Sequence, residues 1–313
     1  LPLSTPMQNT MTPPIMEAAG WLKGVSFPND RPLINLSQAA PTQPPHIALR
    51  REMARIALED DTAHQYGPVL GLSALRGEIA HQWSTAYHGK IALEDVAITS
   101  GCNQAFTAVM ATLCAAGDEI ILPTPWYFNH KMWADMNGVN IAPLKTGPDV
   151  LPDLQSAAKL ITPRTRAIVL VSPNNPGGVE YPADLITQFY ALAKAHRIAL
   201  VIDETYRDFD GRDGVPHYLF QQTEWRDTVV QLYSFSKAYR MMGHRVGAIV
   251  ASPARLTPVE KYLDTVTICP SQIGQRGALW GMQNLAQWLA GERAEILARR
   301  AAIQAAFSPL AAA

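Results

Sequence analysis

This chain of 313 residues contains few cysteines, has almost no net charge and lacks long apolar segments. The three cysteines, Cys102, Cys114 and Cys269, form no Cys-x-x-Cys pair and are odd in number. A disulfide framework or a zinc site is therefore not expected, and a reducing compartment fits. A formal net charge of −1 gives no bulk electrostatic reason to expect nucleic acid or an anionic membrane as a partner.

Segments that would direct the chain to a membrane are also missing. The densest apolar runs, 167–171 and 198–202, have the length of a strand and not of a bilayer span. The first residues, Leu1-Pro-Leu-Ser-Thr-Pro, show neither the basic start nor the long apolar block of a secretory signal. We therefore expect a cytoplasmic protein.

Alternating strands and helices dominate what is present. After a proline-punctuated start, apolar runs predict strands at 96–99, 119–122, 167–171, 198–202, 229–232 and 246–251. Helical spacing predicts helices between and before them, at 50–58, 72–87, 104–116, 153–160 and 184–196. Near-continuous apolar strands separated by helices indicate an α/β fold, a three-layer α/β/α arrangement with a mostly parallel central sheet. Ligands of such sheets bind outside the carboxyl ends of the strands.

The segment after the strand at 229–232 contains the clearest candidate for chemistry. It reads Tyr-Ser-Phe-Ser-Lys-Ala-Tyr-Arg over 233–240 and places Ser234, Ser236 and Lys237 directly after a buried strand, with Arg245 eight residues further on. A lysine in an apolar setting loses solvation, which favours the neutral amine that attacks carbonyls. The serines and Arg245 together suit a phosphate group. The alternative is that Lys237 is an ordinary surface lysine.

Two other predicted strands end in polar side chains. Asp203 follows one strand, and a carboxylate there is costly unless it is paired, for example with a protonated ring nitrogen of a ligand. Tyr206, three residues later, can reach the same face. Asn175 lies in a turn-rich Ser-Pro-Asn-Asn-Pro-Gly-Gly segment after another strand. An ion pair for Asp203 and a plain loop for Asn175 are the competing interpretations.

The strands predicted at 96–99 and 119–122 also lead into candidate ligand segments. Ser100, Gly101 and Cys102 form a small turn at the start of a helix, where backbone N–H groups and the helix dipole favour a phosphate. Trp126 and Tyr127 offer a ring that can stack on a flat heteroaromatic ligand. Turns of this type often bind nothing, and both aromatics are equally consistent with core packing.

These segments, in this order, resemble the class I/II pyridoxal-phosphate (PLP) aminotransferases of fold type I, the aspartate aminotransferase family. The matching motifs are S-x-S-K with R-x-G, D-E-x-Y, N-P-x-G and the S/T-x-G-x-x-x-A phosphate loop, within roughly 34–251. The resemblance implies a Schiff-base lysine, Lys237, with Asp203 and Tyr206 as further catalytic residues. It also implies a PLP site. The residues expected to hold PLP are Ser100, Gly101, Cys102, Tyr127, Asn175, Asp203, Tyr206, Ser234, Ser236, Lys237, Arg245 and Tyr66.

The resemblance also implies partners and a division into domains. Tyr66, in the segment Tyr-Gly-Pro-Val-Leu-Gly, matches a tyrosine that reaches the partner subunit's phosphate in relatives, so we expect a homodimer. We expect an N-terminal arm that begins a small domain at 1–45, a PLP-binding domain at 46–285 and a connecting helix at 286–313. That helix is predicted over 292–307, ending at Pro309.

Departures from the family pattern concern the substrate. Ala39 stands where relatives carry a glycine, which would narrow the pocket, and we expect Ala39 and Asn175 to contact the substrate. None of Arg293, Arg299 and Arg300 matches the arginine that clamps the substrate carboxylate, so we expect a small domain that is missing or truncated. The absence of an arginine over 267–271 favours a neutral, apolar or aromatic amino acid.

The predicted function is amino transfer from an amino acid to a 2-oxo acid. A PLP-dependent C–S β-lyase or a decarboxylase would use the same lysine, aspartate, tyrosine and asparagine, so these residues do not separate the reactions. A non-catalytic PLP-binding regulatory domain is the hypothesis of a different class. Neither a metal nor a nucleic acid is expected.

Overall fold

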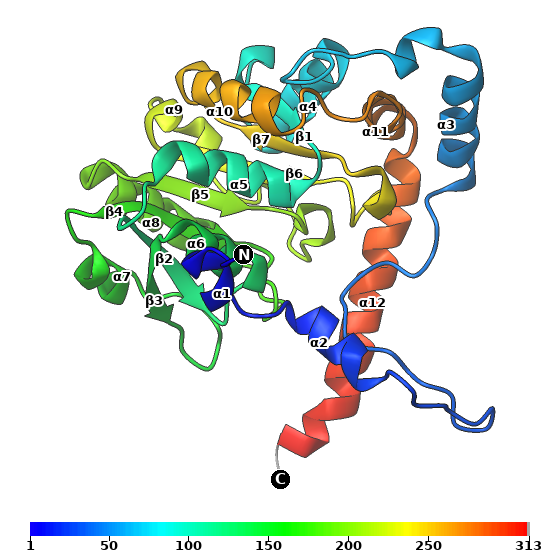
Figure 1. Ribbon diagram of the computed structural model, residues 1–313, viewed down its shortest axis with the longest axis horizontal. Coiled ribbons are helices and arrows are strands. Elements are labelled where there is room, and N and C mark those ends of the chain that lie inside the picture. The colour runs from blue at the N-terminus through cyan, green and yellow to red at the C-terminus, as the bar shows by residue number, and fades with distance from the viewer. Residues whose placement is uncertain (312–313) are drawn as a thin grey trace.

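The computed structural model describes residues 1–311, with side-chain burial described through residue 308. Its centre is a seven-stranded sheet in the order β1-β7-β6-β5-β4-β2-β3 (Figure 1). The strands are β1 (Val96–Thr99), β2 (Glu119–Thr124), β3 (Asn140–Lys145), β4 (Thr165–Val171), β5 (Ala199–Asp203), β6 (Val229–Ser234) and β7 (Gly247–Val250). The six predicted strands are all present, and β3 is an additional one.

Strand direction is mostly parallel, as the sequence predicted. Only β7 runs antiparallel, to both of its neighbours β1 and β6. Because β7 is reversed, the residues that precede it lie at the same edge of the sheet as the residues that follow β6. This reversal brings Arg245, just before β7, to the edge where Ser234 ends β6.

Side chains of the strands alternate between two buried layers, because successive residues of a strand point to opposite faces. In β4, Ile168 and Leu170 belong to one apolar cluster, whereas Ala167 and Val169 belong to the other. The first cluster is covered by α3 (Ile47–Glu59), α4 (Ser73–Ala86), α7 (Leu154–Leu160), α8 (Ala183–Ala195), α9 (Trp225–Thr228) and α11 (Gln272–Asn284). The second is covered by α5 (Cys102–Leu113), α6 (Phe128–Asn137) and α10 (Pro253–Val266). The expected three-layer fold is thereby confirmed.

Elements that the sequence analysis missed have weak local patterns. β3 is a half-exposed edge strand that contains Pro143, as edge strands can. Pro258 lies inside α10, and α11 contains Gly274, Gly277 and Gly281, all poor helix formers. Gly277 is required by packing, because a Cβ there would lie 2.8 Å from Cγ of Met53 on α3.

The two ends of the described chain extend from this body. The proline-rich start contains two short helices, α1 (Thr5–Asn9) and α2 (Pro14–Trp21), within otherwise irregular chain. The last helix, α12 (Ala286–Ala311), begins before its predicted start and runs through Gly291 and Pro309, so the predicted end at Pro309 was wrong. Figure 1 shows α12 projecting beyond the sheet. Ala312 and Ala313, the end of the predicted 286–313 segment, lie outside the described residues.

Short 3₁₀ helices complete the described elements. They are η1 (Asp61–His64), η2 (Leu93–Asp95), η3 (Arg207–Phe209), η4 (Leu219–Gln221) and η5 (Met242–His244). Within residues 1–311, no helix is both long and apolar enough for a membrane span.

Candidate active site

A cavity of about 790 Å³ opens where the carboxyl ends of β4, β5 and β6 meet the N-terminal arm. Ten of the predicted site residues line it: Ala39, Cys102, Tyr127, Asn175, Asp203, Tyr206, Ser234, Ser236, Lys237 and Arg245. Ser100 and Gly101 lie beside it, in the turn before α5. Tyr66 is 82% exposed and does not line the cavity. The edge predicted by the strand-end rule is therefore where the candidate residues gather.

Lys237 extends into this cavity from the segment after β6. Its Nζ donates a hydrogen bond to the carbonyl oxygen of Ala39, at 2.9 Å, and lies 5.6 Å from the centre of the Tyr206 ring. Burial, followed by the charge of Arg245, lowers the pKa of Lys237, although Asp203 acts in the opposite direction. A lowered pKa increases the fraction of neutral amine, which is the nucleophilic form.

Asp203 ends the neighbouring strand and is only 4% exposed. Its Oδ1 accepts hydrogen bonds from the backbone N–H of Thr205 at 3.0 Å and from Sγ of Cys102 at 3.7 Å. Its Oδ2 lies 3.5 Å from Nε2 of His130. Burial by itself would raise the pKa of Asp203, but His130 and Thr205 outweigh it, so the pKa is lowered. Asp203 is therefore a buried carboxylate that stays ionised beside the cavity.

His130 was not among the predicted site residues. It lies on α6, which the sequence analysis missed, and its ring stacks on Phe106 with 3.9 Å between ring centres. With 3% of its surface exposed, its ring is held by packing. His130 lies three residues after Tyr127, and residues at this spacing are neighbours on a helix. The sequence could therefore have indicated His130 as a site residue only if helix α6 had been predicted.

Tyr206 and Tyr127 each form a hydrogen bond with an asparagine side chain that lines this cavity. The Tyr206 hydroxyl accepts a hydrogen bond from Nδ2 of Asn175 at 3.4 Å. Burial, followed by the charge of Asp203, raises the pKa of Tyr206, which therefore remains a hydrogen-bond donor. Burial also raises the pKa of Tyr127 to about 12, and its hydroxyl donates to Oδ1 of Asn103 at 3.3 Å. Of the two candidate aromatics, Tyr127 lines this cavity, whereas Trp126 packs against the second apolar cluster.

Two glycines allow Arg245 and the start of α5 to lie close together at one end of the cavity. Gly101 has φ of 89°, and a Cβ there would lie 2.3 Å from Nη2 of Arg245. Gly247 is equally restricted, since its Cβ would lie 2.6 Å from the carbonyl carbon of Gly101. Both glycines keep Arg245 and the first amides of α5 close together, next to Ser234 and Ser236. A guanidinium, helix-start amides and two hydroxyls are the donors that a phosphate requires.

This donor set tests whether PLP fits the cavity. Its phosphate matches the Arg245 end, and its ring nitrogen needs a buried carboxylate, which Asp203 supplies. An amine, Lys237, is available for its aldehyde, and Asn175 and Tyr206 are available for its phenolic oxygen. The residues present therefore fit this cofactor.

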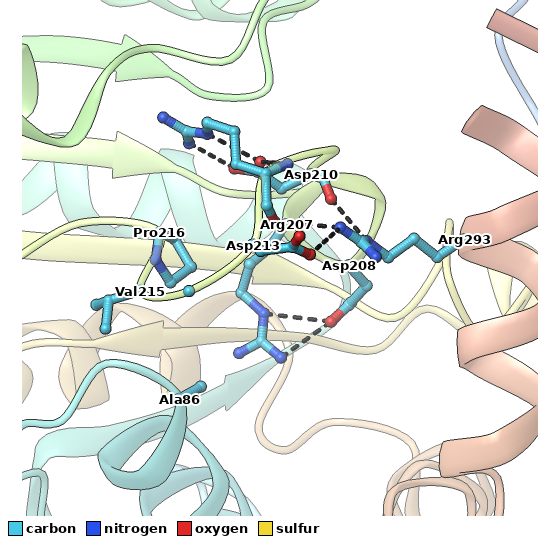
Figure 2. A pocket seen from close by; sticks show the side chains of 10 residues that line it. Ala86, Arg207, Asp208, Asp210, Asp213, Val215, Pro216 and Arg293 are labelled. Carbon is cyan, nitrogen blue, oxygen red and sulfur yellow. Dashed lines mark hydrogen bonds and ion pairs between the residues drawn. The ribbon is translucent and has the colours of Figure 1, made fainter. Parts of the chain in front are cut away.

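A second cavity, of about 350 Å³, lies near α12 and is lined by charged side chains (Figure 2). These charges are already paired. Arg207 binds Asp208 at 2.9 Å, Arg212 binds Asp210 with Nε at 2.9 Å, and Arg293 lies 3.7 Å from Asp213. Arg293 also donates to the carbonyl oxygens of residues 210 and 212. The charged side chains of the second cavity therefore bind one another. In the first cavity, by contrast, the Lys237 amine is hydrogen-bonded, within the residues that the structure describes, only to a carbonyl oxygen of the arm.

Comparisons with known proteins agree with this geometry. The family model for aminotransferase class I and II matches residues 31–310. An aromatic aminotransferase of Arabidopsis thaliana is 32% identical over 277 residues, covering 86% of this chain and 68% of that protein. An aspartate aminotransferase of Thermotoga maritima is 28% identical over 253 residues, covering 80% and 66%. The chain therefore matches about two thirds of the length of these relatives.

A solved structure extends the likeness to the fold. Aspartate aminotransferase from Thermus thermophilus, determined with maleate, superposes with a TM-score of 0.89 over 99% of this chain and 81% of its own, at 22% identity. The Arabidopsis and Thermotoga relatives are both named as aminotransferases, which does not favour the lyase and decarboxylase alternatives. Together with the family match over most of its length, this shows that the chain belongs to the class I and II aminotransferases.

Proposed function

We propose that the protein binds PLP through Lys237 and transfers amino groups between amino acids and 2-oxo acids. The observation that carries this proposal is the convergence of Lys237, Asp203, Tyr206, Asn175 and Arg245 on one cavity. When bound, PLP supplies an aldehyde that captures amino groups and a ring that withdraws electrons from the substrate's Cα. The protein's own residues orient the reactants and move protons.

Lys237 has two tasks in this proposal. Its Nζ, with a lowered pKa, forms the covalent link to the cofactor. When it is not bonded to the cofactor, the same Nζ would take a proton from the substrate's Cα and return it elsewhere. The free amine donates a hydrogen bond to the carbonyl oxygen of Ala39, which would be lost or exchanged when Nζ bonds to the cofactor, so the N-terminal arm contacts the reacting amine directly.

Other residues hold the cofactor in this proposal. Ionised Asp203 keeps the ring nitrogen protonated, and Tyr206 and Asn175 donate to the phenolic oxygen. Tyr127 stacks on the ring. The group assigned to the phosphate consists of Ser100, Gly101, Cys102, Ser234, Ser236 and Arg245. Burial, followed by the charge of Asp203, raises the pKa of Cys102, so it contributes as a neutral thiol.

We also infer that the substrate side chain is neutral and apolar or aromatic. Among the residues that line the cavity, the charged ones are Asp203, Lys237 and Arg245, all assigned to the cofactor. The arm adds Ile15 and Leu36, and α6 adds Phe128. Within the part of the chain that the structure describes, this lining offers apolar contact and no cation besides the two assigned to the cofactor, so it contains no group that would pair with a charged substrate side chain such as a carboxylate. The similarity to an aromatic aminotransferase supports the same substrate class.

A homodimer is part of the proposal, because Tyr66 is exposed and outside the cavity of its own chain. Tyr66 would complete the phosphate site of a partner subunit. Light scattering after size exclusion, with and without PLP, tests this assembly. Tight PLP binding by a monomer, unaffected by Tyr66→Phe, would contradict it.

The central test follows PLP itself. We expect addition of PLP to the purified protein to give a new absorbance band, and borohydride to lock the added mass onto the peptide that contains Lys237. Lys237→Ala should abolish the locked mass. Its persistence on another peptide would refute the assignment.

The reaction type is tested on the same complex. A neutral aromatic amino acid without a 2-oxo acid should shift the band and release one equivalent of 2-oxo acid, and aspartate should do so poorly. Release of a thiol and ammonia from a cysteine-type substrate would support the C–S β-lyase alternative, and a band unchanged by every amino acid would support a regulatory PLP-binding domain.

A further inference from the structure

The carboxylate that follows Asp203 points to the opposite side of the sheet. Glu204 is 2% exposed, and its Oε2 accepts a hydrogen bond from the hydroxyl of Tyr87 at 2.6 Å. Nε2 of His217 lies 3.3 Å from the same oxygen, and Nε2 of Gln231 also donates to it. Burial alone would raise the pKa of Glu204, but His217, Tyr87 and Gln231 outweigh it and the pKa is lowered. None of these residues touches the active-site cavity.

The partners of Glu204 connect three elements. Tyr87 follows α4 directly, His217 lies in the segment before η4, and Gln231 is in the middle of β6. Oε1 of Gln231 in turn accepts a hydrogen bond from Nε1 of Trp83 on α4, at 2.7 Å. All of these side chains are fully or nearly fully buried. Such a network is held in one geometry, because each broken bond would leave a buried polar group unpaired.

A second set of contacts, made by Arg207 and Asp208, links the other end of the segment 203–208 to its neighbours. The guanidinium of Arg207 lies 3.6 Å from the ring centre of Trp83 and donates to Oδ1 of Asp208 through Nε and Nη2, as Figure 2 shows. Oδ2 of Asp208 accepts a hydrogen bond from the hydroxyl of Tyr233 at 2.5 Å. Tyr233 is the residue before Ser234, on the other face of β6.

Both anchors therefore join the segment 203–208 to β6. In this segment, Asp203 and Tyr206 line the cofactor cavity. Glu204, Arg207 and Asp208 do not line it and make their contacts elsewhere. β6 contains Gln231 and Tyr233 on the far face, and its end leads to Lys237. Direct pairing of β5 with β6, up to Asp203 opposite Leu232, sets the spacing of the two strands. The contacts of Glu204 and Asp208 add two links beyond that pairing, next to the residues that lead to Tyr206 and Lys237.

We propose that Glu204 is a positioning residue, which aligns Asp203 and Tyr206 with Lys237 by linking β5, β6 and α4 on the face opposite the cofactor. This inference rests on the proposed function. A carboxylate is needed because three donors, from Tyr87, His217 and Gln231, converge on one oxygen atom. An amide in its place would add an N–H group to a site already supplied with donors.

The test compares two buried carboxylates in the full-length chain. Glu204→Gln removes the charge within the network. Asp95→Asn is the matched control, because Asp95 is 1% exposed and pairs with Arg226 at the opposite end of β1, away from the cavity. For each protein, the dissociation constant for PLP and the pH midpoint of the bound cofactor's absorbance are measured.

We expect Glu204→Gln to weaken PLP binding about tenfold, the size of loss seen when outer hydrogen-bond partners of a binding site are removed. The pH midpoint should rise by at least about 0.5 unit. The reason is that looser donors at Tyr206 and Asn175 leave more negative charge near the Lys237 nitrogen, which favours its protonated form. Asp95→Asn should lower the unfolding temperature and leave both PLP measurements unchanged.

A milder variant covers the case in which Glu204→Gln does not fold. Tyr87→Phe removes one donor to Glu204, keeps the ring and should shift the midpoint in the same direction by less. PLP binding and a midpoint equal to those of wild type in Glu204→Gln, or in Tyr87→Phe where Glu204→Gln does not fold, would overturn the positioning role alone. Failure of the wild-type protein to bind PLP would overturn the proposed function, and this role with it.

Discussion

Nε2 of His130 lies 3.5 Å from Oδ2 of Asp203, behind the face of the carboxylate that borders the cavity. This contact is one of the reasons that the pKa of Asp203 is lowered despite its burial. A carboxylate that stays ionised is what a protonated ring nitrogen requires as a partner. The contact therefore joins a residue from an unpredicted helix to the central residue of the predicted site.

Replacing His130 by Phe should separate the packing of this ring from its polar contact. Phenylalanine keeps a ring that can stack on Phe106, but it removes the nitrogen beside Asp203. Loss of such a contact to a charged group costs about 1.5–3 kcal/mol. We expect PLP to bind at least about tenfold more weakly, measured by absorbance titration. Unchanged affinity in a folded His130→Phe protein would show that Thr205 and Cys102 suffice to hold Asp203.

Gly101→Ala should damage the phosphate end of the site. The new Cβ would meet Nη2 of Arg245, and the left-handed backbone adds strain of about 1–3 kcal/mol. Gly117→Ala is the matched control, because its φ is 88° and nothing lies within 4 Å of the added Cβ. Both variants should be less stable in urea, but only Gly101→Ala should lose affinity for PLP. Equal losses of affinity would place the phosphate elsewhere.

The acid stability of the protein without cofactor should depend on Asp203. Its pKa is lower in the folded protein than in the unfolded chain, so the unfolded chain binds more protons over the interval between the two values. The stabilisation is present above the unfolded pKa of about 3.9 and is lost as the pH falls through the folded pKa. Urea unfolding between about pH 6 and about pH 3 should show a steeper loss of stability for wild type than for Asp203→Asn. Parallel curves would indicate that the folded pKa is not lowered.

Substitution by alanine should change the stability of the fold in opposite directions at two glycines, Gly277 on α11 and Gly291 on α12. Gly277→Ala places a Cβ against Met53 at the α3–α11 contact and should cost about 1–3 kcal/mol. Gly291→Ala, on α12 with open space around it, should stabilise the helix by up to about 1 kcal/mol. Thermal unfolding of both variants measures the difference. Destabilisation by Gly291→Ala would mean that this part of α12 is not helical in solution.

How much the sequence predicted can be judged from particular elements. The buried strands and most helices between them were predicted because their patterns are local: in β4, residues 167–171 are all apolar, and turn residues follow them. β3, α10 and α11 were missed because proline, glycine and exposed polar residues interrupt their patterns. They form because the surrounding structure packs against them, as Met53 does against Gly277.

The sequence by itself determined which residues lie at strand ends, and hence the candidates Lys237, Asp203, Asn175 and Arg245, because a strand end is a local property of the chain. Only the tertiary structure decided which of these ends are neighbours, that β7 is reversed, and that His130 lies against Asp203. It also decided that Glu204 is enclosed by Tyr87 and Gln231, 117 and 27 residues away in the sequence. Contacts over such separations depend on the packing of whole layers, which no local pattern contains.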